Sequence, residues 1–342
     1  MDWQQIQTQL KELGEPTYRA TQLRKPLFEE GISSYAEIST WPESLKEALG
    51  EKSPILSLRL KEMTISTDQR CRKAVLECRD GKKIETVLLR PSEARWTTCI
   101  SSQVGCAIGC PFCATGQMGI KRNLSAEEIT DQVLFWRQFM RKEKIEGRLS
   151  HVVYMGMGEP FSNYEEVSKS LKVLMDQNLF NLAARHISVS TSGIAPKISL
   201  FAENFPQVNF ALSLHAASDE LRNRLVPVNK AYPLDKIREA LKAYLQKSSR
   251  KIFLEYILLK GTNDRPRDAE DLIRFVRSVG PLELLHVNLI IFNQTDSPFE
   301  ATDEKDARLF QKNIMAAKIH STIRQNLGRD IEGACGQLIF KQ

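Results

Sequence analysis

The sequence has no apolar run near the roughly 18 to 20 uncharged residues that a membrane-spanning helix needs, so we expect no membrane partner. It has no low-complexity tract and no fixed-period repeat, which excludes fibrous and repeat architectures. Residues 1–10 are polar and lack a signal peptide's apolar core, so we expect a cytoplasmic protein. Aromatic residues make up only 8% of the chain. The 42% hydrophobic and 26% charged residues are globular proportions, and 342 residues suffice for a large domain with a smaller appendage.

The net charge of +6, from 48 basic and 42 acidic residues, is too mild to indicate nucleic-acid binding by itself. Its distribution is uneven, because residues 66–150 hold 15 basic and 10 acidic residues and so carry +5 of the +6. A solvated basic face and a surface for a polyanion remain equally open interpretations.

Cysteine is scarce and unevenly placed. An odd number in a long chain of a reducing compartment argues against a disulfide framework. Three of the seven lie within eight residues, which indicates a metal site. The cysteines are Cys71, Cys78, Cys99, Cys106, Cys110, Cys113 and Cys335.

Three regions differ in pattern. Residues 1–65 have apolar side chains at helical spacing and predict a small helical domain. Residues 66–91 hold two strand-like runs around Arg79-Asp-Gly-Lys and predict a β-hairpin extension. Residues 92–342 alternate apolar strands with amphipathic helices, which predicts an α/β core.

Six or so β/α units predict a parallel sheet with helices outside, too few for a closed eightfold barrel. We therefore expect an open, partial (β/α)6-type barrel with its site at the carboxyl ends of the strands. Ser125 and Glu128 form a capping box that opens one helix. The expected strands are 98–101, 151–155, 186–190, 208–214, 252–259, 285–292 and 320–324; the further expected helices are 165–177, 234–246, 267–279 and 304–317.

The cysteine cluster reads Cys106-Ala-Ile-Gly-Cys110-Pro-Phe-Cys113. Structural zinc usually takes four ligands, and the next Cys or His downstream is His151. Three thiolates on a four-iron cluster leave one iron open to a non-protein ligand. This CxxxCxxC spacing resembles the radical S-adenosylmethionine (SAM) superfamily. The resemblance implies a [4Fe-4S] cluster whose open iron binds SAM and whose reduction yields a 5′-deoxyadenosyl radical.

Polar or glycine-rich segments follow four of the expected strands, as in Met155-Gly-Met-Gly-Glu-Pro160. Each alone is most simply a strand-end turn, but together they place polar groups at one rim. Glu159 is suited to accept a hydrogen bond from a ligand's ammonium group. We expect the SAM contacts to be Gly158, Glu159, Ser190, Ser213, Leu214, His215 and Asn293.

Cys99 and Cys335 alone would be read as small buried hydrophobic residues. The segments around them together resemble the ribosomal RNA adenine-C2 methyltransferases and their adenine-C8 resistance relatives. These segments are Cys99-Ile-Ser-Ser-Gln-Val-Gly-Cys106 and Gly333-Ala-Cys-Gly-Gln-Leu338. The resemblance covers nearly the whole chain. It includes Lys121-Arg-Asn-Leu, Asn223-Arg-Leu-Val-Pro-Val-Asn, Leu259-Lys-Gly-Thr-Asn-Asp and Val287-Asn-Leu-Ile.

The family resemblance implies a ping-pong methylation that uses two SAM molecules per turnover. Cys335 becomes S-methylcysteine, Cys99 forms a transient disulfide with Cys335, and Glu85 is the proton acceptor. The implied partners are 23S ribosomal RNA, a transfer RNA anticodon loop in some members, and a flavodoxin or ferredoxin as electron donor. We expect a monomer, and Cys71 and Cys78 have no assigned role.

Short sequence motifs bear on which adenine carbon is methylated and on which residues contact RNA. Met157-Gly-Glu-Pro160 resembles the C2 enzymes, because the C8 relatives tend to carry Ala after the Glu. The C8 reaction, or another substrate, is the alternative. Residues 1–65 resemble an accessory RNA-binding domain. Candidate phosphate contacts are Arg70, Arg72, Lys73, Arg79, Lys82, Lys83, Lys121 and Arg122.

Overall fold

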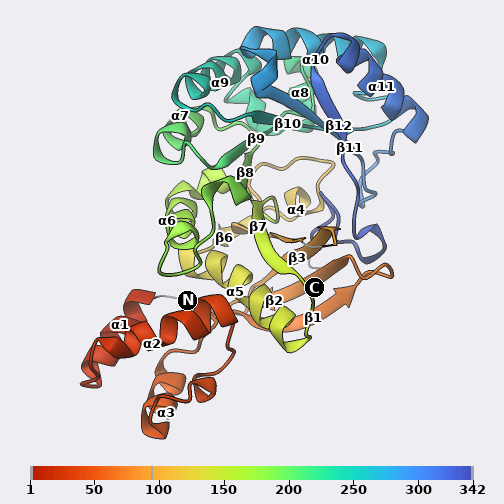
Figure 1. Cartoon of the computed structure of the whole chain (residues 1–342). Coiled ribbons are helices and arrows are strands. Elements are labelled where there is room, and N and C mark those ends of the chain that lie inside the picture. Colours follow the sequence, from red (N-terminus) through yellow and green to blue (C-terminus); the bar gives the residue numbers. More distant parts are fainter. Residues whose placement is uncertain (1–2, 94, 340–342) are drawn as a thin grey trace.

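The computed structural model describes residues 3–93 and 95–339 and is organised around one ten-stranded mixed sheet (Figure 1). The strand order is β1-β2-β3-β4-β7-β8-β9-β10-β11-β12, and a second small sheet pairs β5 with β6. The strands are β1 (Arg59–Ile65), β2 (Cys71–Glu77), β3 (Lys83–Ser92), β4 (Arg95–Cys99), β5 (Gln103–Gly105), β6 (Ile120–Asn123), β7 (Arg148–Tyr154), β8 (Ile187–Thr191), β9 (Asn209–Ser213), β10 (Ile252–Leu258), β11 (Leu285–Ile291) and β12 (His320–Ile323).

The helices lie mainly along the outer side of this curved sheet, whereas the short α4 lies on its inner side (Figure 1). The α-helices are α1 (Trp3–Glu12), α2 (Tyr18–Arg24), α3 (Glu43–Lys52), α4 (Ala114–Gln117), α5 (Ala126–Lys142), α6 (Tyr164–Met175), α7 (Ala195–Asn204), α8 (Asp219–Leu225), α9 (Leu234–Lys247), α10 (Pro266–Val279) and α11 (Glu304–Ala316).

The predicted α/β core is confirmed. Every neighbouring pair from β4 through β7 to β12 is parallel and follows chain order, as repeated β/α units require. Strand β10 is an almost continuous buried apolar run, which is typical of a parallel strand covered on both faces. Within the described residues, β1 and β12 end the sheet and do not pair with each other, so the barrel is open.

The first four strands, β1 to β4, are antiparallel neighbours, and one of them, β1, was not expected from the sequence. Residues 59–65 were expected to be helical, and this expectation is wrong because Arg59–Ile65 forms β1, antiparallel to β2. Its side chains are mostly exposed, and Lys61 pairs with Glu77 of β2 at 3.5 Å. Charged residues are common on edge strands, and they concealed the strand pattern here. The expected hairpin is confirmed as β2 and β3, and β3 joins β4 in the same sheet.

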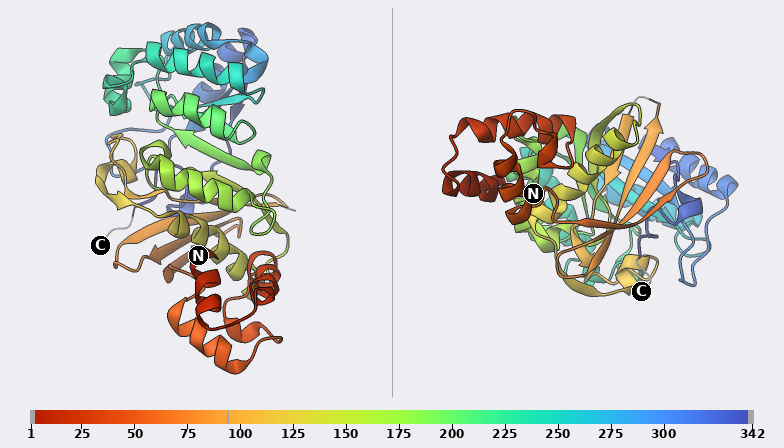
Figure 2. Two further views of the ribbon diagram at one scale, coloured as in Figure 1. Left: turned by 90° about the vertical axis from the view of Figure 1, so that its left-hand side faces the viewer. Right: turned by 90° about the horizontal axis from the view of Figure 1, so that it is seen from below.

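The N-terminal helices pack beside α5 at one end of the molecule (Figure 2). Phe28 packs edge-on against Phe180 with ring centroids 5.0 Å apart, and Gln138 of α5 donates to the Ile32 carbonyl at 2.7 Å. The predicted capping box of α5 is confirmed: Ser125 and Glu128 exchange hydrogen bonds at 3.2 and 3.0 Å. None of the described helices is long and apolar enough to span a bilayer.

Candidate active site

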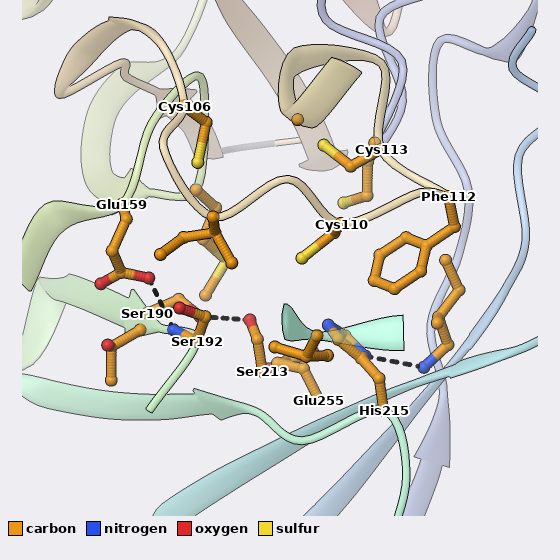
Figure 3. Close-up of a pocket in the computed structure, with 18 of the residues that line it drawn as sticks. Cys106, Cys110, Phe112, Cys113, Glu159, Ser190, Ser192, Ser213, His215 and Glu255 are labelled. Atoms are coloured by element: carbon orange, nitrogen blue, oxygen red, sulfur yellow. Dashed lines mark hydrogen bonds between the residues drawn. The ribbon is translucent and has the colours of Figure 1, made fainter. Parts of the chain in front are cut away.

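A cavity of about 180 Å³ lies at the carboxyl ends of the parallel strands, where the fold predicts a site. Its walls come from the ends of β7 to β11, from the loop between β5 and α4 (Figure 3), and from Arg324, Cys335 and Gly336 of the C-terminal segment. We call it the first cavity. The residues used below that line it are Cys106, Cys110, Cys113, Gly158, Glu159, Ser190, Ser192, Ser213, His215, Glu255, Arg324 and Cys335.

Cys106, Cys110 and Cys113 converge on this cavity from one loop, as predicted (Figure 3). Burial raises the pKa of all three thiols, so three thiolates here require a positive centre to stabilise them. Among the described residues, no three His, Cys, Asp or Glu side chains are close enough to share one metal ion. Three thiols on one loop, lining one cavity, fit a cluster in which each sulfur binds a different iron.

Glu159 is fixed at the end of β7 by two backbone amides. Its carboxylate accepts from the Phe161 amide at 2.9 Å and from the Ser192 amide at 2.7 Å. Burial raises its pKa, and these amide bonds oppose that rise. Gly158 before it has φ +98°, and a Cβ there would lie 2.5 Å from the Cβ of Gln103, so only glycine fits this turn. The turn presents a buried acceptor suited to an ammonium group.

Ser190, Ser213 and His215 form the neighbouring wall (Figure 3). The two serine hydroxyls lie 3.0 Å apart across β8 and β9. Nδ1 of His215 accepts from the Ile257 amide at 3.1 Å, and burial lowers the imidazole pKa to about 3. His215 is therefore neutral near pH 7, with its proton on Nε2 as a donor.

Two of the expected cofactor contacts are not among the residues that line the first cavity. Leu214 is buried, and its amide donates to the Glu255 carbonyl at 3.0 Å. The Asn293 side chain donates to the Cys335 carbonyl at 3.1 Å and accepts from Arg329 at 2.8 Å. Asn293 thus holds the chain segment that carries Cys335.

A second cavity adjoins the first and contains both of the remaining thiols of interest. Cys99 and Cys335 line it, and both cavities share Cys113, Met155 and Cys335 in their walls. Both thiols are free in this structure. Cys99 and Cys335, which are 236 residues apart in the sequence, therefore line one space beside the three-cysteine loop.

The segment 328–339, here called the Cys335 loop, is held against α4. The Ala114 amide donates to the Gly336 carbonyl at 2.8 Å, and the Thr115 hydroxyl donates to the Leu338 carbonyl at 2.5 Å. These bonds attach the loop to the helix that begins directly after Cys113. The placement of Cys335 is thereby coupled to that of the three-cysteine loop.

Glu85 lies on the same face of the sheet as Cys99 but does not line either cavity. Val87, two residues after Glu85 on β3, is directly opposite Cys99 of β4. The Glu85 carboxylate is buried and pairs with the Lys73 ammonium at 3.1 Å. Burial raises its pKa, and Lys73 opposes the rise.

Two of the cations named as candidate phosphate contacts are buried against other partners. Lys73 is buried against Glu85, and Arg72 is buried with its guanidinium over the Trp96 ring. Acidic side chains also pair with three others. These pairs are Arg79 with Glu127, Lys82 with Asp80, and Arg122 with Asp80 and Glu128.

Sequence reasoning missed Arg222 of α8, a fully buried cation beneath the site. It donates to the carbonyls of Ser192 at 2.6 Å and Leu214 at 3.0 Å and to the Asn229 amide oxygen at 2.7 Å. Burial lowers its pKa to about 10. It ties the ends of β8 and β9 together. Its segment, Asp219–Leu225, reads like any charged surface helix, so the sequence contains no signal for this role.

Comparisons with known proteins agree with this geometry. The radical SAM superfamily matches residues 100–276, more than half of the chain. A Bacillus pumilus protein named probable dual-specificity RNA methyltransferase RlmN is 42% identical over 334 residues, covering 97% of this chain and 91% of that protein. A Dictyoglomus turgidum protein of the same name is 39% identical, covering 98% and 94%. The crystal structure of a radical SAM methyltransferase from Sphaerobacter thermophilus has a TM-score of 0.92 and 37% identity, covering 99% of this chain and 97% of that one.

These matches confirm the resemblance drawn from the cysteine motifs, and they extend over nearly all of the chain. The fold, the three-cysteine loop and the similarity to RNA-modifying enzymes lead to one assignment. The chain belongs to the radical SAM superfamily and, within it, to the RlmN family of RNA methyltransferases.

Proposed function

We propose that this methyltransferase places a methyl group on C2 of an adenine in 23S ribosomal RNA, and on an adenine of a transfer RNA anticodon loop. The proposed route is ping-pong, through an S-methyl group on Cys335, with two SAM molecules consumed per turnover. The observation that carries it is the second cavity, which Cys99 and Cys335 both line beside Cys113 of the three-cysteine loop. Ring C2 of adenine is electrophilic, so simple displacement at a SAM methyl group cannot methylate it.

The superfamily implies SAM and a [4Fe-4S] cluster, and the residues of the first cavity fit both. Cys106, Cys110 and Cys113 would hold the cluster. Together, cluster and SAM supply one-electron reduction and hydrogen abstraction from a methyl group. Glu159, with the serine hydroxyls and the His215 donor beside it, would orient SAM. The proposed SAM contacts are Gly158, Glu159, Ser190, Ser213 and His215, which line the cavity, together with Leu214 and Asn293, which lie outside its lining.

Cys335 acts first in the proposed sequence, as the nucleophile. Its thiolate attacks the methyl carbon of a sulfonium, forms a new C–S bond and releases a thioether, without net oxidation. After hydrogen abstraction from that methyl group, the carbon bonds to the adenine ring, which is then tethered to Cys335. Glu85 removes the ring proton. Within the described part of the chain, its Oε2 accepts no hydrogen bond and so keeps free lone pairs.

Cys99 completes the cycle by attacking the Cys335 sulfur. The S–S bond forms, the bond from sulfur to the methyl carbon breaks, and that carbon takes up a proton. The one electron left over from the radical addition would return to the oxidised cluster, and the methylated base is released. An external dithiol reductant then returns both cysteines to thiols. The second cavity supports this pairing, because both cysteines line it.

The remaining partners follow from the substrate. A target adenine must be unstacked, which single-stranded loops of RNA allow. Residues 1–65, apart from strand β1, would act as an accessory RNA-binding domain, residues 66–91 as a β-hairpin extension that β1 joins, and residues 92–342 as the catalytic core. We propose that the protein is cytoplasmic, because its RNA substrates are cytoplasmic. We also propose that it acts as a monomer and that a flavodoxin or ferredoxin is its electron donor.

Mass spectrometry of RNA from a deletion strain tests this function. We expect loss of 2-methyladenosine from 23S ribosomal and transfer RNA, restored by the wild-type gene but not by Cys335→Ala. If complementation restores 8-methyladenosine and not 2-methyladenosine, the enzyme methylates C8 and the proposed C2 position is wrong. Full methylation by the Cys335→Ala protein would refute the proposed two-thiol route.

A further inference from the structure

Arg324 lies directly after β12 and lines both cavities. Its amide donates to the Leu289 carbonyl at 2.8 Å, which continues the pairing of β12 with β11. Among the described residues that line the two cavities, it is the single Lys or Arg. Its position is therefore fixed by the sheet, and its charge is the principal positive charge that these walls contain.

Glu255 of β10 anchors the Arg324 side chain from below. Its Oε1 lies 3.8 Å from Arg324 Nη1 and accepts a hydrogen bond from the Asn288 side chain at 2.8 Å. Glu255 and Asn288 are direct neighbours across β10 and β11, and both are buried. The buried carboxylate thus lies beside a guanidinium whose side chain is 43% exposed, at the edge of the cavity.

Arg324, Cys99 and Cys335 all line the second cavity, so the cation lies beside both thiols. Desolvation by the cavity walls raises the pKa of Cys335 and of Cys99, and Arg324 lowers the pKa of both. The other groups that face Cys335 are acidic: Glu255 from β10, and the Cys113 thiol before α4. The Cys335 and Cys71 thiols also raise the pKa of Cys99. Arg324 is thus the one group near both sulfurs that favours a thiolate.

We propose that Arg324 is a shared counter-ion that stabilises the Cys335 thiolate for methyl acceptance and then the Cys99 thiolate for product release. The inference deepens the proposed function and rests on it. When Cys335 ionises, its proton passes to water, since this residue is exposed to solvent in the cavity. When Cys99 ionises later, Cys335 is an uncharged thioether, so one cation serves both steps without competition.

The test measures thiol ionisation directly. Full-length protein, reconstituted anaerobically with its cluster, is treated with iodoacetamide from pH 6 to 10. Alkylation of the unmodified Cys335 and Cys99 peptides is followed by mass spectrometry. The pH midpoint reports ionisation, whereas access to the sulfur changes only the maximal rate. The proteins are wild type, Arg324→Gln, Arg324→Lys and Arg308→Gln. Arg308 is an exposed arginine of α11 whose pairing with Glu304 is remote from the cavities.

We expect Arg324→Gln to raise both midpoints by about one pH unit, which slows alkylation near pH 7.5 by roughly tenfold. Arg324→Lys should give midpoints between those of wild type and Arg324→Gln, and Arg308→Gln should match wild type. Unchanged midpoints in Arg324→Gln and Arg324→Lys would overturn the proposal, as would an equal shift in Arg308→Gln. Because this assay involves no RNA, its failure would leave the Cys335→Ala complementation result intact.

Discussion

Replacing Lys73 by methionine removes the buried ion-pair partner of Glu85, the proposed proton acceptor. This variant tests most sharply whether that ion pair stabilises the Glu85 carboxylate. The two charges are 3.1 Å apart, and their side chains are 10% and 2% exposed. With an effective dielectric constant of about 20, their attraction is roughly 5 kcal/mol, part of which is offset by desolvation. Removing one partner leaves an uncompensated carboxylate. We therefore expect Lys73→Met to lower the free energy of unfolding by about 3–5 kcal/mol near pH 7.5.

The pH dependence of this loss has a definite sign. Burial raises the pKa of Glu85 above its ordinary value, so the fold favours the protonated carboxyl. That contribution to stability is complete below the ordinary glutamate pKa and is lost as pH rises through the folded value. Without Lys73 the folded pKa rises further. The deficit of Lys73→Met should therefore shrink when the pH falls from 7.5 to 5.

Urea unfolding followed by circular dichroism, at pH 7.5 and pH 5, measures these effects. Four proteins are compared: wild type, Lys73→Met, Glu85→Gln and the double variant. We expect the double variant to be more stable than Lys73→Met at pH 7.5, and its stability to change less between the two pH values than that of Lys73→Met, because it lacks the titrating carboxyl. A Lys73→Met deficit that is equal at both pH values, or is unrelieved by Glu85→Gln, would refute the reasoning.

Three further outcomes follow from local geometry. Gly328→Ala should lower the melting temperature and expose the Cys335 loop to limited proteolysis, because φ is +73° and a Cβ would lie 2.3 Å from Cys71 Sγ; Gly14→Ala has the same φ in open space and should cost less. Equal losses in the two glycine variants would contradict this. Folded His215 has a pKa of about 3, so its contribution to stability is present above pH 6.5 and lost as pH falls toward 3. His215→Gln should flatten that fall in urea unfolding at pH 4–7, and an unchanged slope would argue against a buried neutral imidazole. Ser125→Ala removes the N-cap of α5 and should cost about 1 kcal/mol in urea unfolding; no loss would mean that Glu128 caps alone.

The β/α core was predictable because its signals are local and repeated. Buried runs such as Ile252–Leu258 and amphipathic helices such as Leu234–Lys247 alternate with the period that parallel sheets require. The strand Arg59–Ile65 was not predictable, since its exposed, charged side chains have no strand periodicity and only pairing with β2 defines it. Helix α7 was also missed.

The site divides in the same way. The spacing of Cys106, Cys110 and Cys113 placed three thiols together without any knowledge of the fold. Arg222 and Arg324 act through distant partners, Ser192 and Glu255, so no local pattern marks them. Lys73 was misread for the same reason. A lysine beside other cations looks like a phosphate contact, until the opposite strand supplies Glu85.

The most direct measurement of the central claim is mass spectrometry of the Cys99→Ala protein, purified without oxygen from cells that contain its RNA substrates. The account predicts RNA attached covalently to this protein through Cys335 and its added carbon, because the thiol that releases the product is missing. Cys99→Ala protein that carries no such adduct and still methylates adenine at the wild-type rate would contradict it.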